Sequence, residues 1–386
     1  MTTMTDLAEL TAATAHLDPP LVALDVAALR ANAADLVRRA GGKPVRVASK
    51  SVRCRAVLDL ALATPGFSGV MGYSLREAIW LVRNGVRDVL LGYPSADRGA
   101  LAELAADPVL TAAITVMVDG AEQLALARAA AGDTALRVCI DVDASLRIGR
   151  LHLGVRRSPL RTPACAAALA ETALAQGFRV VGVMFYEAQI AGLPDSSAAV
   201  RLVKRRSVAE LAQRRGAVVA AVQAVAGELE IVNGGGTGSL EISSADPAVT
   251  EVTAGSGLYV PTLFDNYRAF EPRPALYFAL PVVRRPAPRI ATLFGGGYVA
   301  SGPAGKSRMP KPAARGLKLI GAEGVGEVQT PVRGVAAAGL RVGDRVWFRH
   351  AKAGELCERF DTVHFVRDGA ITESVPTYRG EAKAYG

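Results

Sequence analysis

The segment PVRVASK (residues 44–50) shows the pattern that decides the fold, because a short β-type run ends in polar residues and leads into a helical stretch, Val52–Leu62. The same unit of strand and helix recurs along the chain. The candidate strands are Leu21–Asp25, Val45–Ser49, Gly69–Tyr73, Asp88–Gly92, Ala113–Val118, Leu136–Asp141, Arg179–Phe185, Leu229–Asn233 and Thr250–Thr253. Helical stretches between them include Val26–Ala40, Leu75–Asn84, Ala121–Ala131 and Val200–Gly227. Alternation over about 250 residues predicts a parallel sheet covered by helices. A count near eight favours a closed (β/α)8 barrel of the TIM type over an open doubly wound sheet.

The sequence changes character after about residue 266. The later β-type segments are short and are separated by stretches rich in Gly and Pro; they are Ala275–Val283, Arg289–Phe294, Leu340–Arg349 and Thr362–Val366. We therefore expect an α/β chain with a barrel domain at residues 20–266. A second, mostly β domain is expected from residues 1–19 together with 267–386. Leu21–Asp25 is expected to be the first strand of the barrel.

The composition bounds the class of protein. Half of the 386 residues are hydrophobic and 21% are charged, so the chain can bury a large core. The net charge is +9, and 37 of the 45 basic residues are Arg. These residues are spread along the chain without interleaved aromatics, which argues against nucleic-acid binding. The four cysteines form no CxxC, the N-terminus lacks the apolar stretch of a signal peptide, and no apolar run has transmembrane length. We expect a reduced, cytoplasmic protein that binds neither nucleic acid nor membrane.

Glycine-rich turns follow the last two candidate strands, at Gly234–Gly238 and at Gly255–Gly257. Backbone N–H groups in such turns can converge on an anion, and barrels often place a phosphate site after their late strands. The alternative is two tight turns that need a positive φ. Only Lys43 and Lys50 occur among the first 203 residues, and Lys50 ends an early strand. A lysine at a barrel mouth with a phosphate site suits Schiff-base chemistry with a phosphorylated aldehyde, although a surface lysine is the alternative.

The order of several segments resembles the fold-type III pyridoxal phosphate (PLP) enzymes, the alanine racemase-like family, and within it the D-threonine aldolase and D-serine dehydratase branch. These segments are PPLVALDVAALRANA, RVASK, DVDASLRIG, GVMFYEAQIAG, GGGTG and TAGSGLYV. The resemblance implies that Lys50 holds PLP through a Schiff base. It also implies phosphate binding by two groups of residues, Gly236, Thr237 and Gly238, and Gly255, Ser256 and Gly257. By the same resemblance, Arg147 lies beside the cofactor ring or its phenolic oxygen, and Tyr186 lies near the ring.

Two departures from the family pattern lie close to these residues. Gln189 stands where the His of the family's YxGH segment would fall. The branch's KTHK pattern reads Lys50-Ser-Val-Arg53 here. The nearby loop with His152, Arg156 and Arg157 could meet a substrate carboxylate or be an exposed basic loop.

A third departure lies in FRHAKAGELCERFD (348–361). The branch binds a divalent metal through a His and, two residues later, an Asp or Cys; here His350 matches the first position and Lys352 stands at the second. One reading is that the Lys352 ammonium replaces the metal near the substrate β-hydroxyl, with His350 as the acid and base at that hydroxyl. Another is a rearranged metal site of His350 with Cys357, Glu355 or Asp361. A third is that His350 is a packed histidine of the second domain. We favour the first.

The resemblance thus implies a PLP-dependent lyase, either an aldolase or a dehydratase, for a small β-hydroxy amino acid of D configuration. The alternatives are an amino-acid racemase of the same fold and a non-catalytic PLP carrier. A racemase needs a second base, for which Tyr267, Tyr277 and Tyr298 are available. Family precedent also implies a homodimer with shared active sites. The long loop Gly295–Pro310 is a candidate for a role beside the active site.

Overall fold

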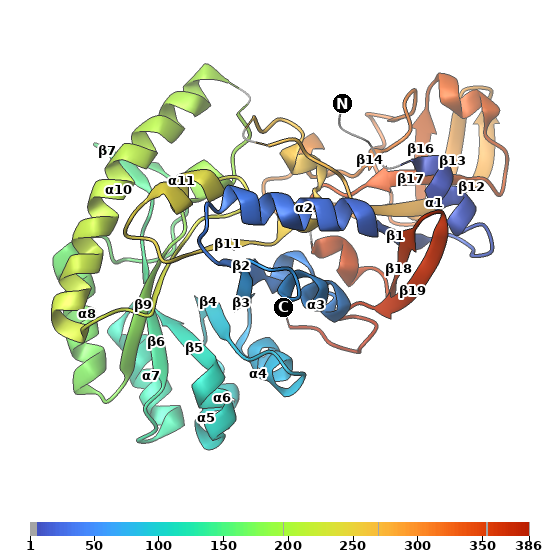
Figure 1. Cartoon of the computed structure of the whole chain (residues 1–386). Helices are drawn as coiled ribbons and strands as arrows, with labels where there is room; N and C mark the ends of the chain where they lie inside the picture. Colours follow the sequence, from blue (N-terminus) through green and yellow to red (C-terminus); the bar gives the residue numbers. More distant parts are fainter. Residues whose placement is uncertain (1–5, 196, 269, 353, 386) are drawn as a thin grey trace. The chain divides into compact units, whose positions relative to one another are not determined.

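The computed structural model describes residues 6–195, 197–268, 270–352 and 354–385 (Figure 1). The chain forms two compact units. The sheet unit contains residues 1–34, 50–60 and 255–384, and the barrel unit contains residues 35–49, 61–254 and 385–386. No helix in the described ranges is long and apolar enough to cross a membrane.

The barrel unit is built on eight parallel strands that close on themselves in the order β10-β11-β2-β3-β4-β5-β6-β9. The strands are β2 (Val45–Ala48), β3 (Phe67–Gly72), β4 (Val89–Pro94), β5 (Ile114–Val118), β6 (Arg137–Val142), β9 (Arg179–Phe185), β10 (Ile231–Gly234) and β11 (Glu251–Ala254). The helices that alternate with them are α2 (Val26–Arg39), α3 (Arg55–Leu62), α4 (Leu75–Arg83), α5 (Arg98–Ala106), α6 (Pro108–Ala113), α7 (Ala121–Ala131), α8 (Pro163–Ala175), α9 (Ala188–Ala191), α10 (Ala198–Ala226), α11 (Leu240–Ala245) and α12 (Ser256–Tyr259). This architecture confirms the predicted barrel.

Apolar side chains fill the barrel interior. One buried cluster comprises Leu90, Met117, Cys139, Val181, Met184 and Ile231. Burial on both faces explains why the strands read as apolar runs without polar alternation, as parallel strands under helices usually do. Side-chain caps begin several of the helices. Asp97 accepts a hydrogen bond from Ala100 N at α5, and Ser197 accepts one from Val200 N at α10.

One ion pair interrupts this apolar interior. Arg46 of β2 donates two hydrogen bonds of 2.7 Å to Glu251 of β11, and its Nη2 lies 2.8 Å from Asp88 Oδ2. Asn233 of β10 donates to Glu251 Oε1 at 2.7 Å and to Thr253 Oγ1 at 2.8 Å. Because Arg46 is 2% exposed, its charge is stable there only while these partners remain.

The sheet unit contains a nine-stranded sheet in which β15-β16-β13-β12-β1-β18-β19 form the main path and β17 pairs with β12 and β14. Its strands are β1 (Leu21–Asp25), β12 (Leu276–Ala287), β13 (Ile290–Phe294), β14 (Lys311–Pro312), β15 (Lys318–Leu319), β16 (Gln329–Arg333), β17 (Arg345–Arg349), β18 (Thr362–Arg367) and β19 (Ala370–Pro376). Helix α1 (Leu7–Ala13) packs on it through Leu10 and Ala13, in a cluster with Tyr277 and Trp347. The predicted mostly β second domain is therefore confirmed.

The expectation that Leu21–Asp25 starts the barrel is wrong. Strand β1 pairs antiparallel with β12 and parallel with β18, so it belongs to the sheet unit. Four of its five residues are buried, which makes its apolar run indistinguishable from a buried barrel strand. Its partners lie more than 200 residues away in the sequence, where local periodicity carries no information about pairing.

Candidate active site

Three neighbouring barrel strands lead directly into the residues expected to hold a phosphorylated aldehyde. Strand β11 lies between β10 and β2, with Val252 paired to Gly234 and Ala254 paired to Val47. Since the strands are parallel, their C-terminal ends lie at one rim of the barrel. The chain leaves β2 through a short 3-10 helix, Ser49–Ser51, that contains Lys50. It leaves β10 and β11 through the two glycine-rich turns.

Within the sheet unit, the backbone of Lys50 packs against the segment that follows His350 and Lys352. Gly354 has φ +86°, and a Cβ built there would lie 1.9 Å from the Lys50 carbonyl oxygen, so only glycine fits. The same oxygen accepts a hydrogen bond of 3.1 Å from Arg53 Nε. Arg53 in turn pairs with Glu358 at 2.5 Å. Lys50 and the His350 segment are thus held together by close backbone packing.

His350 is 3% exposed, and its ring lies edge-on to Tyr259, 6.3 Å between centroids. Tyr259 donates to the Val52 carbonyl oxygen at 3.0 Å, two residues after Lys50. Burial and then the charge of Arg349 lower the pKa of His350 to about 3, against a small opposing effect of the Leu276 backbone. Neither ring nitrogen makes a hydrogen bond of normal geometry to a described residue. A buried ring nitrogen that makes no good hydrogen bond costs about 1–3 kcal/mol, which a hydroxyl group of a ligand could recover.

Lys352 is held by two other side chains of the sheet unit. Its Nζ donates to Ser301 Oγ at 2.8 Å and lies 3.5 Å from Glu355 Oε1. Ser301 binds Glu355 through both its N–H and its hydroxyl, at 2.6 and 2.5 Å. These bonds tie the loop Gly295–Pro310 to the segment that carries His350 and Lys352.

The side chains around His350 do not fit a divalent metal. A protonated Lys352 stands where the second ligand would be, and its charge opposes a cation. Cys357 is buried, and burial raises the pKa of its thiol, which hydrogen-bonds with Tyr259. Asp361 pairs with Arg379 at 2.9 Å. Across the described ranges, no three His, Cys, Asp or Glu side chains converge as metal ligands, so the rearranged site proposed for His350 finds no support.

In the barrel unit, two hydrogen bonds with side chains fix the backbone of the turn Gly234–Gly238. Ser239 Oγ accepts from Gly236 N at 3.1 Å, and Arg39 Nη2 donates to Thr237 O at 2.6 Å. A Cβ on Gly236 would lie 3.0 Å from Ala191 Cβ and 3.7 Å from Tyr186 Cε2. The turn therefore has no room for a side chain at Gly236, and it lies beside Tyr186. This backbone surface next to an aromatic ring fits the phosphate and ring of PLP.

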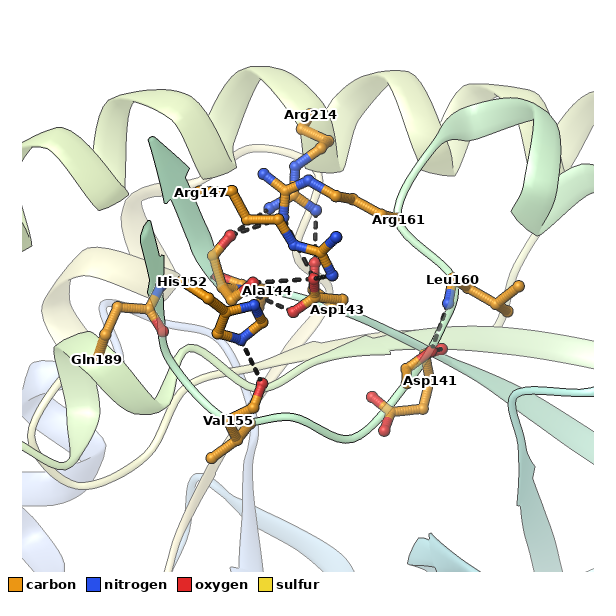
Figure 2. Close-up of polar contacts among 12 residues, drawn as sticks. Asp141, Asp143, Ala144, Arg147, His152, Val155, Leu160, Arg161, Gln189 and Arg214 are labelled. Carbon is orange, nitrogen blue, oxygen red and sulfur yellow. Dashed lines mark hydrogen bonds and ion pairs between the residues drawn. The ribbon is translucent and has the colours of Figure 1, made fainter. Parts of the chain in front are cut away.

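Arg147 and Tyr186 occupy different surroundings in the same unit. Arg147 lies on the hairpin of β7 (Leu146–Ile148) and β8 (Leu151–Leu153), with Nη2 2.7 Å from Asp143 Oδ2 (Figure 2). Tyr186 has the guanidinium of Arg157 at 5.1 Å over its ring, and Arg157 also lies 5.4 Å over Tyr93. Gln189, at the position of the family His, donates to Ala144 O at 2.7 Å. Arg157, which the sequence offered only as part of a basic loop, is thus a cation in contact with the ring of Tyr186.

Asp141, near the end of β6, is a strand-end residue of the kind expected to line the active face of a barrel. Its side chain borders a small cavity with Arg157, Ser158 and Tyr186. Burial, followed by the charge of Asp119, raises the pKa of Asp141 to about 7, while Arg157 acts in the opposite direction. The carboxyl therefore exchanges its proton near neutral pH. A shift of this kind depends on tertiary burial, which has no local sequence signal.

This pKa gives a stability prediction. Between about pH 4 and 7 the folded state keeps a proton on Asp141 that the unfolded state releases, so the free energy of unfolding falls as the pH rises, by about 4 kcal/mol. Above pH 7 the contribution of Asp141 to the free energy of unfolding no longer changes with pH. Asp141→Asn should remove that part of the pH dependence, measured by urea unfolding at pH 5 and pH 8. Asp133→Asn, at an exposed site of the same unit, is the control, and equal pH dependence of the Asp141→Asn variant and the wild type would contradict the assignment.

The barrel, the lysine at its rim and the separate β sheet define a class, the alanine racemase-like fold. Residues 24–262 match the family described as "Alanine racemase, N-terminal domain". The chain therefore belongs to this family, whose members depend on PLP.

Three individual proteins are also similar to this chain, one in sequence and two in structure. A D-threonine aldolase from Arthrobacter sp is 29% identical over 287 residues, which cover 71% of this chain and 70% of the relative. The crystal structure of D-threonine aldolase from Filomicrobium marinum aligns with a TM-score of 0.80 at 22% identity, covering 95% of this chain and 96% of that one. D-threo-3-hydroxyaspartate dehydratase from Delftia sp. HT23 aligns with a TM-score of 0.72 at 20% identity, covering 94% and 97%. The two structures establish the shared fold.

Proposed function

We propose that the chain is a PLP-dependent lyase that acts on a small β-hydroxy amino acid of D configuration, as an aldolase or a dehydratase. The observation that carries this proposal is the packing of Gly354 on the Lys50 carbonyl, which joins the lysine to the segment of a buried His350 whose ring nitrogens make no hydrogen bond of normal geometry to a described residue. A hydroxyl-bearing substrate matches that imidazole. The names of the relatives, a D-threonine aldolase and a D-threo-3-hydroxyaspartate dehydratase, support the same substrate class.

The residues of both units have separable tasks in this proposal. In the sheet unit, Lys50 would bind the aldehyde of PLP, and Gly255–Gly257 are candidates for binding its phosphate. In the barrel unit, Gly236–Gly238 and Tyr186 are the candidate contacts for the phosphate and the ring. When bound, PLP supplies an electron sink for the pair left on the substrate Cα. The Lys50 amine would be the base for the Cα proton in a dehydratase. His350, neutral because of burial, accepts the β-hydroxyl proton in an aldolase, and the Lys352 ammonium offsets the charge that develops on that oxygen.

A substrate screen tests the proposed function. The purified protein, incubated with PLP, is offered D- and L-threonine, D- and L-serine and the 3-hydroxyaspartates, and aldehyde, keto acid and ammonia are measured. We expect product from D isomers only. Deuterium entering Cα without loss of amino acid would instead indicate a racemase. Visible absorption of bound PLP without any turnover would indicate a carrier and overturn the proposal.

The Lys352 cation gives a second prediction. Exhaustive chelation with EDTA should change the turnover of the preferred substrate less than about twofold, because the ammonium stands where a metal ligand would be. Lys352→Met should lower kcat about 30-fold, which corresponds to about 2 kcal/mol of lost charge stabilisation. Lys306→Met, in the neighbouring long loop, is the matched control and should keep its activity. Loss of activity on chelation, restored by Mn²⁺, would refute this role.

A further inference from the structure

A groove of about 430 Å³ in the barrel unit has a strongly basic lining. Its described lining consists of Arg147, Gly149, Arg150, Leu151, His152, Arg156, Arg157, Ser158 and Pro159. Four of these nine residues are arginines, and none is a carboxylate. We call these nine residues the arginine groove.

Hydrogen bonds and strand pairing hold the backbone of the segment that carries the arginine groove. The β7–β8 hairpin pairs Arg147 with His152, and His152 Nε2 lies 3.1 Å from Val155 O. Asp143 binds Arg147, and Arg214 donates to the Asp143 carbonyl at 2.6 Å (Figure 2). Ser158 Oγ donates to Asp141 O at 2.7 Å. The arginines therefore project from a fixed loop, which lowers the entropy that ligand binding would cost.

The positive charge of the groove is only partly compensated. Asp143 pairs with Arg147, whereas Arg150 and Arg156 make no hydrogen bond or ion pair with any described residue. Arg157 lies over the rings of Tyr93 and Tyr186, at the ends of β4 and β9. It also borders the small cavity that holds Asp141. The groove thus adjoins the rim where the site residues of the barrel unit gather.

We infer that the arginine groove binds a second anionic group, a carboxylate or a phosphate, on the side chain of the substrate. This inference rests on the proposed function and narrows its substrate class to acidic β-hydroxy amino acids. A single α-carboxylate occupies one or two guanidinium groups, and four arginines exceed that need. A methyl or hydrogen, as in threonine or serine, would leave Arg150 and Arg156 without an anion to pair with, whereas an acidic side chain would engage them.

The test compares an Arg150→Gln/Arg156→Gln double variant with the wild-type holoenzyme. The wild type should prefer D-threo-3-hydroxyaspartate to D-threonine in kcat/KM by about 100-fold. The double variant should lose most of that preference through a higher KM for D-threo-3-hydroxyaspartate. The control is Arg87→Gln/Arg315→Gln, which removes the same charge at two exposed positions outside the groove and should keep the preference.

A binding measurement without turnover separates this inference from the proposed function. In calorimetric titrations of the holoenzyme, succinate or inorganic phosphate should bind about tenfold more tightly to the wild type than to the double variant. Tighter binding of succinate indicates a carboxylate side chain, and tighter binding of phosphate indicates a phosphorylated one. Suppose that neutral β-hydroxy amino acids are turned over, and that the wild type and the double variant show the same preference between acidic and neutral substrates. This result would overturn the inference and leave the proposed function intact. If no β-hydroxy amino acid is turned over, the proposed function fails. If, in addition, the wild type and the double variant bind each of the two anions equally tightly, the inference that the arginine groove binds an anionic group is overturned as well.

Discussion

Lys50→Ala is expected to lower turnover by about 1,000-fold or more and to remove the visible absorption that PLP acquires on binding to a lysine. Lys50 lies in the 3-10 helix directly after β2, between the strand and the contact of its carbonyl with Gly354. No other lysine follows a barrel strand in this way, as only Lys43 and Lys50 occur among the first 203 residues. Absorbance and a substrate assay on the same preparation measure both effects.

Lys43→Ala is the matched control for this variant. Lys43 Nζ donates to the Asp246 carbonyl at 2.5 Å, and Lys43 precedes β2 whereas Lys50 follows it. Its replacement should leave the absorption in place and change turnover little. A Lys50→Ala protein that still shows the absorption and turns over substrate would overturn the cofactor assignment and with it the proposed function.

Arg46→Met is expected to destabilise the protein by about 3–5 kcal/mol, because it leaves the buried Glu251 carboxylate without its main partner. Glu251→Met should cost a similar amount by leaving the Arg46 guanidinium buried. Urea unfolding, monitored by far-UV circular dichroism, measures the change. The control is Arg137→Met, which breaks an ion pair with a half-exposed Glu230 and should cost about 1 kcal/mol or less.

The double variant Arg46→Met/Glu251→Met tests the reason for this effect. If an unpaired buried charge causes the loss, removing both charges should restore part of the stability, so that the two changes are strongly non-additive. Additive losses would show that lost packing, rather than the unpaired charge, dominates at this place in the barrel.

The sequence was informative where burial leaves a local pattern. Strand Arg179–Phe185 and helix Ala121–Ala131 have the predicted bounds, since one is a continuous apolar run between turn signals and the other an Ala/Leu-rich stretch before a glycine. Strand β1 has the same local pattern as a barrel strand, and only its pairing with β12 and β18 assigns it to the other sheet. Such pairing is a property of the folded chain.

Some residues of the candidate site could also be located from the sequence, and others could not. Lys50 and the two glycine-rich turns could be located because strand ends mark the rim of a barrel. The raised pKa of Asp141 and the contact of Arg157 with two tyrosines arise from tertiary burial. The partner of Lys352 was equally hidden, since Ser301 lies 51 residues earlier in a loop whose sequence gives no contact information.

The segment that carries the lysine has a consequence for biosynthesis. Although Lys50 is encoded early, residues 50–60 belong to the sheet unit, and their contacts come from the end of the chain. Arg55 pairs with Glu381, 326 residues later, and Tyr378 N donates to Arg53 O at 2.9 Å. During translation the barrel strands emerge long before these partners exist. The lysine loop therefore reaches its final conformation only after residues 378–381 have been synthesised, and a nascent chain halted before that point lacks the contacts that hold this loop.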